Sequence, residues 1–313
     1  MCKFFFLCYT SYMKTRFQPQ FDLKQTAESG QCFRMTPCAP DVWSVVSGER
    51  YLEISQDAST FYFDCPDKDY PFWVNYFDLD TDYGAYIASV RKRDSYLTAA
   101  AGAGSGIRIL RQDVWEMIVT FIISQQRTIP KIREAVEALS CRYGVRRETV
   151  LSGGAGRVYY TFPTPEQLGR ASLDELKALK LGYRAAYISR ICEDALQGRL
   201  DLDKLSAMDY ERAFEYLTGF YGIGAKIANC VCLFGLHHID AFPVDTWISQ
   251  ILMEHYYPKN PKKYRALPKS RLYEALIRDY FGGYQGYAGV MQQYIFYYER
   301  KEAGNGAGRR TYK

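Results

Sequence analysis

The sequence lacks the cysteine pattern of a disulfide-built or zinc-binding protein. Its nine cysteines are an odd number, are scattered over 313 residues and include no Cys-x-x-Cys pair. A secreted disulfide framework is short and dense in cysteine, and a zinc site needs closely spaced cysteine or histidine ligands. The chain has three histidines, and none has ligand-like spacing. We therefore expect reduced cysteines, most of them small buried residues, and no metal site.

Long hydrophobic runs are also missing. The apolar run at residues 4–9 is shorter than a signal-peptide core and has no small-residue cleavage site. The run at 114–123 is about half the length that a bilayer requires, so we predict a buried helix there. We expect a protein that is neither secreted nor in a membrane. The first residues are interpreted as a frayed extension, unless Met13 is the true start.

Positive charge exceeds negative charge only slightly. The formal net charge is +5, which is compatible with nucleic-acid binding but does not indicate it, because a basic footprint has to be local. Aromatic residues, in contrast, are abundant at 16%, with 28 tyrosines, and supply surface for packing or stacking. Composition alone favours no function.

The chain changes character near residue 106. Before it, β-prone runs at 42–46, 51–55 and 60–65 are separated by turn signals, and a small-residue stretch at 99–106 looks like a junction. After it, helix signals recur. We predict an α+β protein with a small antiparallel sheet followed by a helical body. The expected boundaries are 1–20 for an N-terminal extension, 21–106 for the sheet domain, 107–303 for the helical domain and 304–313 for a disordered tail.

Capping patterns locate several of the expected helices. Asp113 with Glu116, Thr164 with Gln167 and Ser172 with Glu175 resemble capping boxes. Ser206 is expected to cap a helix that carries an apolar stripe at positions 210, 214 and 217. Further helices are predicted at 129–143, 183–196, 245–255, 269–281 and 286–300.

A helix, a tight turn and a second helix are predicted at 209–234. Glycine at 222 and 224 permits positive φ and close approach of another backbone, and the first amides of the second helix can bind a phosphate. A P-loop is excluded because Ala225 follows Gly224, and a dinucleotide fingerprint lacks its third glycine and its strand. A helix-hairpin-helix that binds a nucleic-acid backbone and an ordinary αα-hairpin both remain open.

Two residues near this turn suggest chemistry, although each has an ordinary explanation. Lys226 opens the second helix, with Cys230 one turn later on the same face. Such a lysine usually clamps a phosphate. Asp245 follows in Pro243-Val244-Asp245, where a new helix begins, and a lone aspartate there is usually an N-cap.

The combination of a Gly-x-Gly-x-Lys hairpin with a downstream Pro-Val-Asp resembles the helix-hairpin-helix (HhH-GPD) DNA glycosylases. It is most similar to the 8-oxoguanine DNA glycosylase/lyase family, over roughly residues 21–296. Ser29-Gly30-Gln31-Cys32-Phe33-Arg34 and Leu181-Gly182-Tyr183-Arg184-Ala185 carry further parts of the resemblance. It implies a base-excision-repair enzyme with both glycosylase and abasic-site lyase activity. Relatives that only hydrolyse the base have no lysine at position 226.

The resemblance assigns the catalytic pair. Lys226 would attack C1′ as a neutral amine, open the sugar and form a Schiff base that permits β-elimination. Asp245 would stabilise the positive charge that develops at the sugar.

Four residues are assigned to the flipped base by the same resemblance. The carbonyl of Gly30 would accept the N7 hydrogen that 8-oxoguanine has and guanine lacks. Gln292 would read the Watson–Crick edge, and Phe296 and Cys230 would stack on opposite faces of the base. Gln292 and Phe296 share a helical face. Without the family, Phe296 would be taken as a core aromatic.

The remaining assignments concern DNA. Gln126 would fill the gap left by the flipped base, with Tyr183 as a wedge, and the other expected contacts are Arg127, Lys131, Arg184, Gly222, Gly224 and Trp247. Three of these depart from the family, which has asparagine at 126 in eukaryotes, arginine at 131 and histidine at 247. Lysine lacks the arginine fork. We therefore expect relaxed selectivity for the base opposite the lesion.

No cofactor is expected. An iron–sulfur cluster is not expected because no cysteine follows Cys232, although hairpin carbonyls near Phe220 and Ile223 could hold a monovalent cation. The expected partner is duplex DNA containing 8-oxoguanine, bound by a monomer in a bacterial or archaeal cytoplasm, with the nucleoid. The alternatives are a glycosylase for alkylated bases, which usually lacks the lysine, and a non-catalytic DNA-binding module, which would not need Asp245.

Overall fold

The structure, a computed structural model, describes residues 13–304. The predicted disordered tail, apart from Gly304 at the end of the last helix, and most of the predicted extension lie outside the described residues. The first part of the chain forms a five-stranded antiparallel sheet in the order β1-β5-β4-β3-β2. Its strands are β1 (Lys14–Phe17), β2 (Met35–Ala39), β3 (Val42–Ser47), β4 (Arg50–Asp57) and β5 (Thr60–Asp64).

Alternating burial explains why these residues form a sheet with one covered face. In β5, Phe61 and Phe63 are fully buried while their neighbours are half-exposed, as a period of two requires. Helix α2 (Tyr70–Tyr76) packs against this face through Trp73 and Tyr76, and α1 (Leu23–Glu28) contributes Leu23. The sheet therefore has its own core, separate from that of the helical body.

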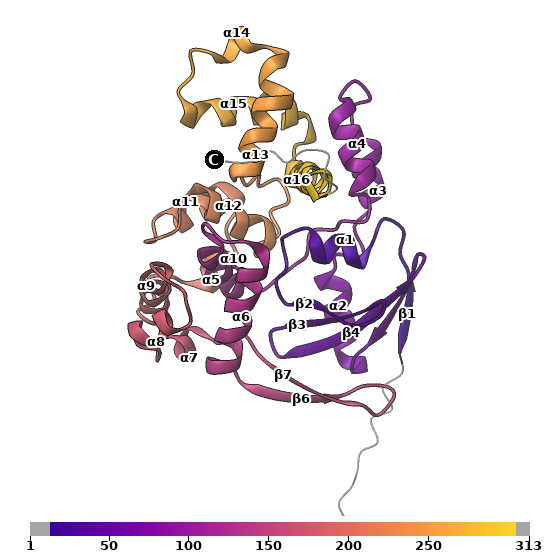
Figure 1. The fold of residues 1–313 in the computed structure, drawn as a ribbon, viewed down its shortest axis with the longest axis vertical. Coiled ribbons are helices and arrows are strands. Elements are labelled where there is room, and N and C mark those ends of the chain that lie inside the picture. Colours follow the sequence, from indigo (N-terminus) through magenta and orange to yellow (C-terminus); the bar gives the residue numbers. More distant parts are fainter. Residues whose placement is uncertain (1–12, 305–313) are drawn as a thin grey trace, which may run out of the picture.

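The predicted α+β architecture is confirmed, and so are the three expected strands. The predicted extension at 1–20 is wrong in part, because Lys14–Phe17 pairs with β5 as an edge strand. Four residues with alternating charged and other side chains give too short a pattern to recognise. A second sheet was also not expected: β6 (Arg146–Val150) and β7 (Gly156–Tyr160) form a hairpin within the helical region that runs beneath the first sheet (Figure 1).

The helical body surrounds a larger core and carries the site (Figure 1). In the range that the structure describes, its helices are α5 (Val114–Ser124), α6 (Ile129–Tyr143), α7 (Pro165–Leu168), α8 (Leu173–Ala178), α9 (Arg184–Leu196), α10 (Leu202–Ser206), α11 (Tyr210–Thr218), α12 (Ala225–Phe234), α13 (Thr246–Ile251), α14 (Pro261–Tyr264), α15 (Lys269–Phe281) and α16 (Ala288–Gly304). A π-turn at Leu252–Tyr256 extends α13. No helix in this range could cross a membrane.

Several local predictions need correction. Ser206 ends α10, and the cap of α11 is Asp209, whose carboxylate accepts the Arg212 amide. The small-residue stretch at 99–106 is mostly helical rather than a junction, because alanine favours the helix. This helix, α4 (Ser95–Ala103), packs on α16 and therefore belongs with the helical body. Helix α3 (Tyr83–Ala88) precedes it. The capping boxes at Thr164 and Ser172 are confirmed, whereas Asp113 caps α5 through the Glu116 amide alone.

A buried ionic cluster joins the segment before α5 to the loop after α12. The Asp78 carboxylate lies 2.9 Å from Arg111 Nη2 and 3.3 Å from His237 Nε2. Burial raises the pKa of Asp78, but His237 and Arg111 outweigh that effect and hold it at about 2. The cluster thus fixes the sheet side of the molecule against the helix-hairpin-helix.

Candidate active site

Lys226 lies in the first turn of α12, directly after the hairpin turn. Its Nζ donates to Ser124 Oγ at 3.1 Å and lies 5.2 Å above the centre of the Phe121 ring. Both contacts come from α5, so two helices far apart in sequence position this amine. Ser124 and Phe121 were not predicted as site residues. Their helix was predicted from its apolar run and its Asp113 cap, neither of which indicates a site.

Asp245 faces the same space from the start of α13. Its Oδ1 accepts the Ile248 amide at 2.9 Å, so the ordinary N-cap explanation holds as well as the chemical one. Burial raises the pKa of Asp245 above its ordinary value, while the Ile248 amide and the charge of Lys226 lower it in part. Asp245 therefore caps α13 with Oδ1 and at the same time interacts electrostatically with the amine of Lys226.

A cavity of about 380 Å³ contains both residues, and we call it the smaller cavity. Five segments build it: the loop after α1, the end of α5 with the start of α6, the start of α12, the start of α13, and α16. Its wall includes the predicted residues Gly30, Phe296, Arg127 and Trp247 together with Lys226 and Asp245. The fold therefore brings six of the predicted site residues together around one space.

Gly30 occupies a conformation that favours glycine, with φ of +82°. A Cβ there would lie 3.1 Å from Phe296 Cε1 and 3.6 Å from Arg300 Nη1. The adjacent Gln31 fixes the loop, since its side-chain amide donates to the Arg108 carbonyl and accepts the Leu110 amide, both at 2.8 Å. The backbone of Gly30 thus forms part of the cavity wall with no side chain in the way.

Cys230 and Gln292, which were also predicted for this site, are buried. Each is 3% exposed, and neither lines the cavity. Gln292 Nε2 donates to the Pro243 carbonyl at 3.3 Å, two residues before Asp245. Burial raises the pKa of the Cys230 thiol to about 11, although Lys226 lowers it in part. Their roles toward a base stay predictions.

The predicted hairpin turn is present at 219–224. Gly222 has φ of +91°, and a Cβ there would lie 2.5 Å from Tyr187 Cγ, so the turn packs directly on a ring of α9. Gly224 is exposed and caps α12. The first amides of α12 face outward at this end, which suits a phosphate.

Tyrosines that the sequence analysis missed extend this surface. The rings of Tyr183 and Tyr187 lie 5.6 Å apart, and Tyr187 and Tyr221 are 5.0 Å apart. Tyr221, at the hairpin turn, is 63% exposed. The wedge candidate Tyr183 is therefore continuous with the hairpin through a row of rings. Only the high tyrosine content hinted at it.

The prediction of a direct DNA contact by Arg184 is wrong. Its guanidinium is buried and donates to the carbonyls of Gln125 and Leu181. Gln125 in turn donates to the Gly222 carbonyl at 3.3 Å. Arg184 therefore holds the loop after α5, and Gln125 connects that loop to the hairpin. The sequence position of an arginine does not show whether it ties backbone segments together in this way or contacts DNA.

That loop displays Gln126 to solvent with φ of +50°. Arg127 is half-buried and donates to the Lys180 carbonyl. Lys131 is exposed on the first turns of α6, 3.8 Å from Glu134 Oε2. Gln126 and Lys131 thus remain accessible for the predicted contacts.

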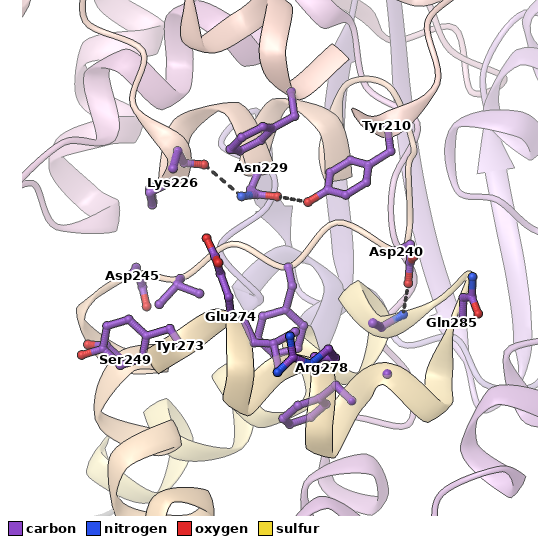
Figure 2. A pocket seen from close by; sticks show the side chains of 18 of the residues that line it. Tyr210, Lys226, Asn229, Asp240, Asp245, Ser249, Tyr273, Glu274, Arg278 and Gln285 are labelled. Atoms are coloured by element: carbon purple, nitrogen blue, oxygen red, sulfur yellow. Dashed lines mark hydrogen bonds between the residues drawn. The ribbon is translucent and has the colours of Figure 1, made fainter. Parts of the chain in front are cut away.

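A second cavity of about 960 Å³ is also lined by Lys226 and Asp245, and we call it the larger cavity. Figure 2 shows Lys226 and Asp245 at one end of it, with Glu274 and Arg278 entering from α15. Tyr210 donates to Asn229 at 2.7 Å along its wall. No cluster of three metal-ligating side chains occurs between residues 13 and 304.

Comparisons with known proteins agree with this geometry. A family model described as 8-oxoguanine DNA glycosylase, N-terminal domain, matches residues 15–118, and one described as HhH-GPD superfamily base excision DNA repair protein matches 119–272. The N-glycosylase/DNA lyase of Saccharomyces cerevisiae is 34% identical over 230 residues, which cover 66% of this chain. The match spans 59% of the yeast protein, which is longer.

Two solved structures cover nearly the whole chain. MBOgg1 in complex with a low-affinity DNA ligand is 33% identical with a TM-score of 0.81, over 93% of this chain and 99% of that one. The Clostridium acetobutylicum 8-oxoguanine glycosylase/lyase, in complex with duplex DNA containing cytosine opposite 8-oxoG, is 28% identical with a TM-score of 0.80, over 93% and 98%.

Proposed function

The chain belongs to the 8-oxoguanine DNA glycosylase family of the HhH-GPD superfamily, and we propose that it excises 8-oxoguanine from duplex DNA and cleaves the strand. The observation that carries the proposal is the placement of Lys226 and Asp245 in one cavity that Gly30 and Phe296 also line. That arrangement puts an amine and a carboxylate beside a slot that can hold a flipped base.

The chemistry follows from these positions. The neutral Nζ of Lys226 attacks C1′, the bond from C1′ to N9 breaks, and the electron pair leaves with the base, which takes up a proton. The carboxylate of Asp245 stabilises the positive charge that develops on the sugar. Loss of the ring oxygen from C1′ gives a Schiff base, and removal of a C2′ proton then expels the 3′ phosphate. Ser124 orients the amine through its 3.1 Å contact.

The hairpin and the row of tyrosines supply the DNA surface. The α12 amides after Gly224 bind a backbone phosphate, and Tyr183 enters the duplex beside the lesion, with Gln126 in the space that the base leaves. Gln126 and Lys131 are exposed, which supports their roles as DNA contacts. Their departure from the family residues, together with Trp247 in place of histidine, supports relaxed discrimination of the opposite base.

The enzyme is proposed to act as a monomer and to need no cofactor, since each step above uses the chain's own groups. The Phe220 carbonyl accepts the Ile223 amide and keeps a second lone pair, so this turn fits a structural monovalent cation. The predicted location in a prokaryotic cytoplasm with the nucleoid gains no support, because relatives come from a yeast as well as a bacterium.

The test uses end-labelled duplexes with one 8-oxoguanine opposite each normal base, with borohydride added to parallel samples. Wild type is expected to cleave the strand and to form a trapped covalent complex, and Lys226→Gln is expected to lose both. Lys204→Gln, which removes an exposed lysine from α10, is the matched control. Binding without excision on every duplex would contradict an enzyme. Excision that survives Lys226→Gln would indicate a hydrolytic glycosylase.

A further inference from the structure

Arg300 is a residue of the smaller cavity that takes no part in the chemistry proposed above. It lies on α16 and lines the smaller cavity beside Gly30 and Phe296. Its Nη1 donates to the Glu28 carbonyl at 2.9 Å, and its guanidinium carbon lies 5.4 Å from the centre of the Phe296 ring. The Glu28 contact fixes the cation at this wall, and other N–H donors of the five on a guanidinium remain for a ligand.

The spacing along α16 places Arg300 relative to a bound base. Gln292, Phe296 and Arg300 are four residues apart, so they follow one another along one helical face. The helix rise puts Gln292 and Arg300 roughly 12 Å apart along the axis, on either side of Phe296. A base stacked on Phe296 with its Watson–Crick edge toward Gln292 therefore points its opposite edge toward Arg300.

In 8-oxoguanine that opposite edge is the five-membered ring, which carries N7–H and O8. Gly30 lies at the same end of the face, since a Cβ on it would be 3.1 Å from Phe296 and 3.6 Å from Arg300 Nη1. The edge thus presents one donor and one acceptor to a wall that contains one carbonyl and one cation. The N7–H matches the Gly30 carbonyl, which leaves O8 for the guanidinium.

We propose that Arg300 donates a hydrogen bond to O8 of the flipped 8-oxoguanine, and so reads the oxygen that distinguishes the lesion from guanine. This rests on the proposed function. When the bond from C1′ to N9 breaks, the electron pair on N9 is shared through C8 with O8, so the same contact stabilises the departing base. Guanine has a C–H at this position and would offer the cation no acceptor on the base.

The test separates base recognition from the lyase step. An abasic-site duplex has no base in the cavity, so Arg300→Met is expected to cleave and trap it as wild type does. Excision of 8-oxoguanine under single-turnover conditions is expected to fall about 10- to 100-fold, the range for a charge-assisted hydrogen bond. Methionine retains packing over Phe296 but has no donor. Arg300→Lys is expected to recover part of the rate.

Lys301→Met is the control, because it removes the neighbouring exposed charge of α16. Wild-type excision by Arg300→Met would overturn the inference and leave the proposed function intact. Equal loss of excision and abasic cleavage would also overturn it, since the residue would then act on DNA binding or folding. If wild type excises no 8-oxoguanine while cleaving abasic DNA, the proposed function fails first.

Discussion

The two cavities that share Lys226 and Asp245 differ in size and in chemistry. The larger, about 960 Å³, is walled on one side by α15, with Tyr273, Glu274 and Arg278. The smaller, about 380 Å³, is lined by the Gly30 backbone, the Phe296 ring and the partly buried Arg300 guanidinium. Only the smaller offers a planar slot with a specific acceptor and donor at its edge. Size is therefore a poor guide here, and the reacting base is assigned to the smaller cavity by its polar groups.

The largest expected effect in this comparison is that of Asp245→Asn, which removes the carboxylate common to both cavities. Asparagine also caps helices, so α13 should remain in place. We expect single-turnover excision to fall about 10²- to 10³-fold, as for loss of one preorganised electrostatic contact. Rapid-quench assays on 8-oxoguanine duplexes, with thermal unfolding as the check on folding, measure it.

The pH dependence of excision gives a second test of the role of Asp245. Burial raises the pKa of Asp245, so the active carboxylate is protonated and lost as pH falls through that raised pKa, earlier than for an ordinary aspartate. Wild-type excision should therefore decline more steeply on the acidic side than excision by Asp245→Asn. An identical acidic limb in both proteins would contradict the assignment.

A smaller effect is expected from Gly30→Ala, which changes the smaller cavity alone. The positive φ costs about 1–2 kcal/mol with a side chain, and the methyl group would crowd Phe296. We expect excision of 8-oxoguanine to fall about 10- to 100-fold with abasic-site cleavage retained. Gly153→Ala, where a Cβ meets nothing within 4 Å, is the control. Unchanged excision would move the base out of this cavity.

The smallest effect is expected in the larger cavity. Glu274→Gln and Tyr273→Phe alter its α15 wall without touching the smaller one. Substitutions away from a functional contact usually change free energies by under about 0.5 kcal/mol, so excision should stay within about threefold of wild type. A tenfold loss in either variant, measured in the same rapid-quench assay, would mean that the substrate enters the larger cavity.

The hairpin was predicted from local chemistry, and the family resemblance predicted that Lys226 and Asp245 share one site, as they do in the smaller cavity. Glycines at 222 and 224 and the aspartate before α13 act within a few residues of themselves, and a family motif includes them. Helix α15 was predicted with its observed ends for the same reason, since its apolar periodicity is local.

The rest of the site depends on contacts between distant segments, which no local pattern records. No local sequence pattern separates Arg184 from Arg300. Arg184 is buried and donates to the Gln125 carbonyl, whereas Arg300 lines the smaller cavity. Arg300 could have been noticed from its spacing four residues after Phe296. Ser124 could not, because its place in the site depends on its hydrogen bond with Lys226, which lies 102 residues later in the chain.

The most direct test identifies the residue that bonds to the sugar. Wild-type protein trapped with borohydride on an 8-oxoguanine duplex would be digested with nuclease and protease, and the modified peptide sequenced by mass spectrometry. We predict that the reduced deoxyribose adduct lies on Lys226, in the α12 peptide. An adduct on another lysine, with Lys226 unmodified, would contradict the account.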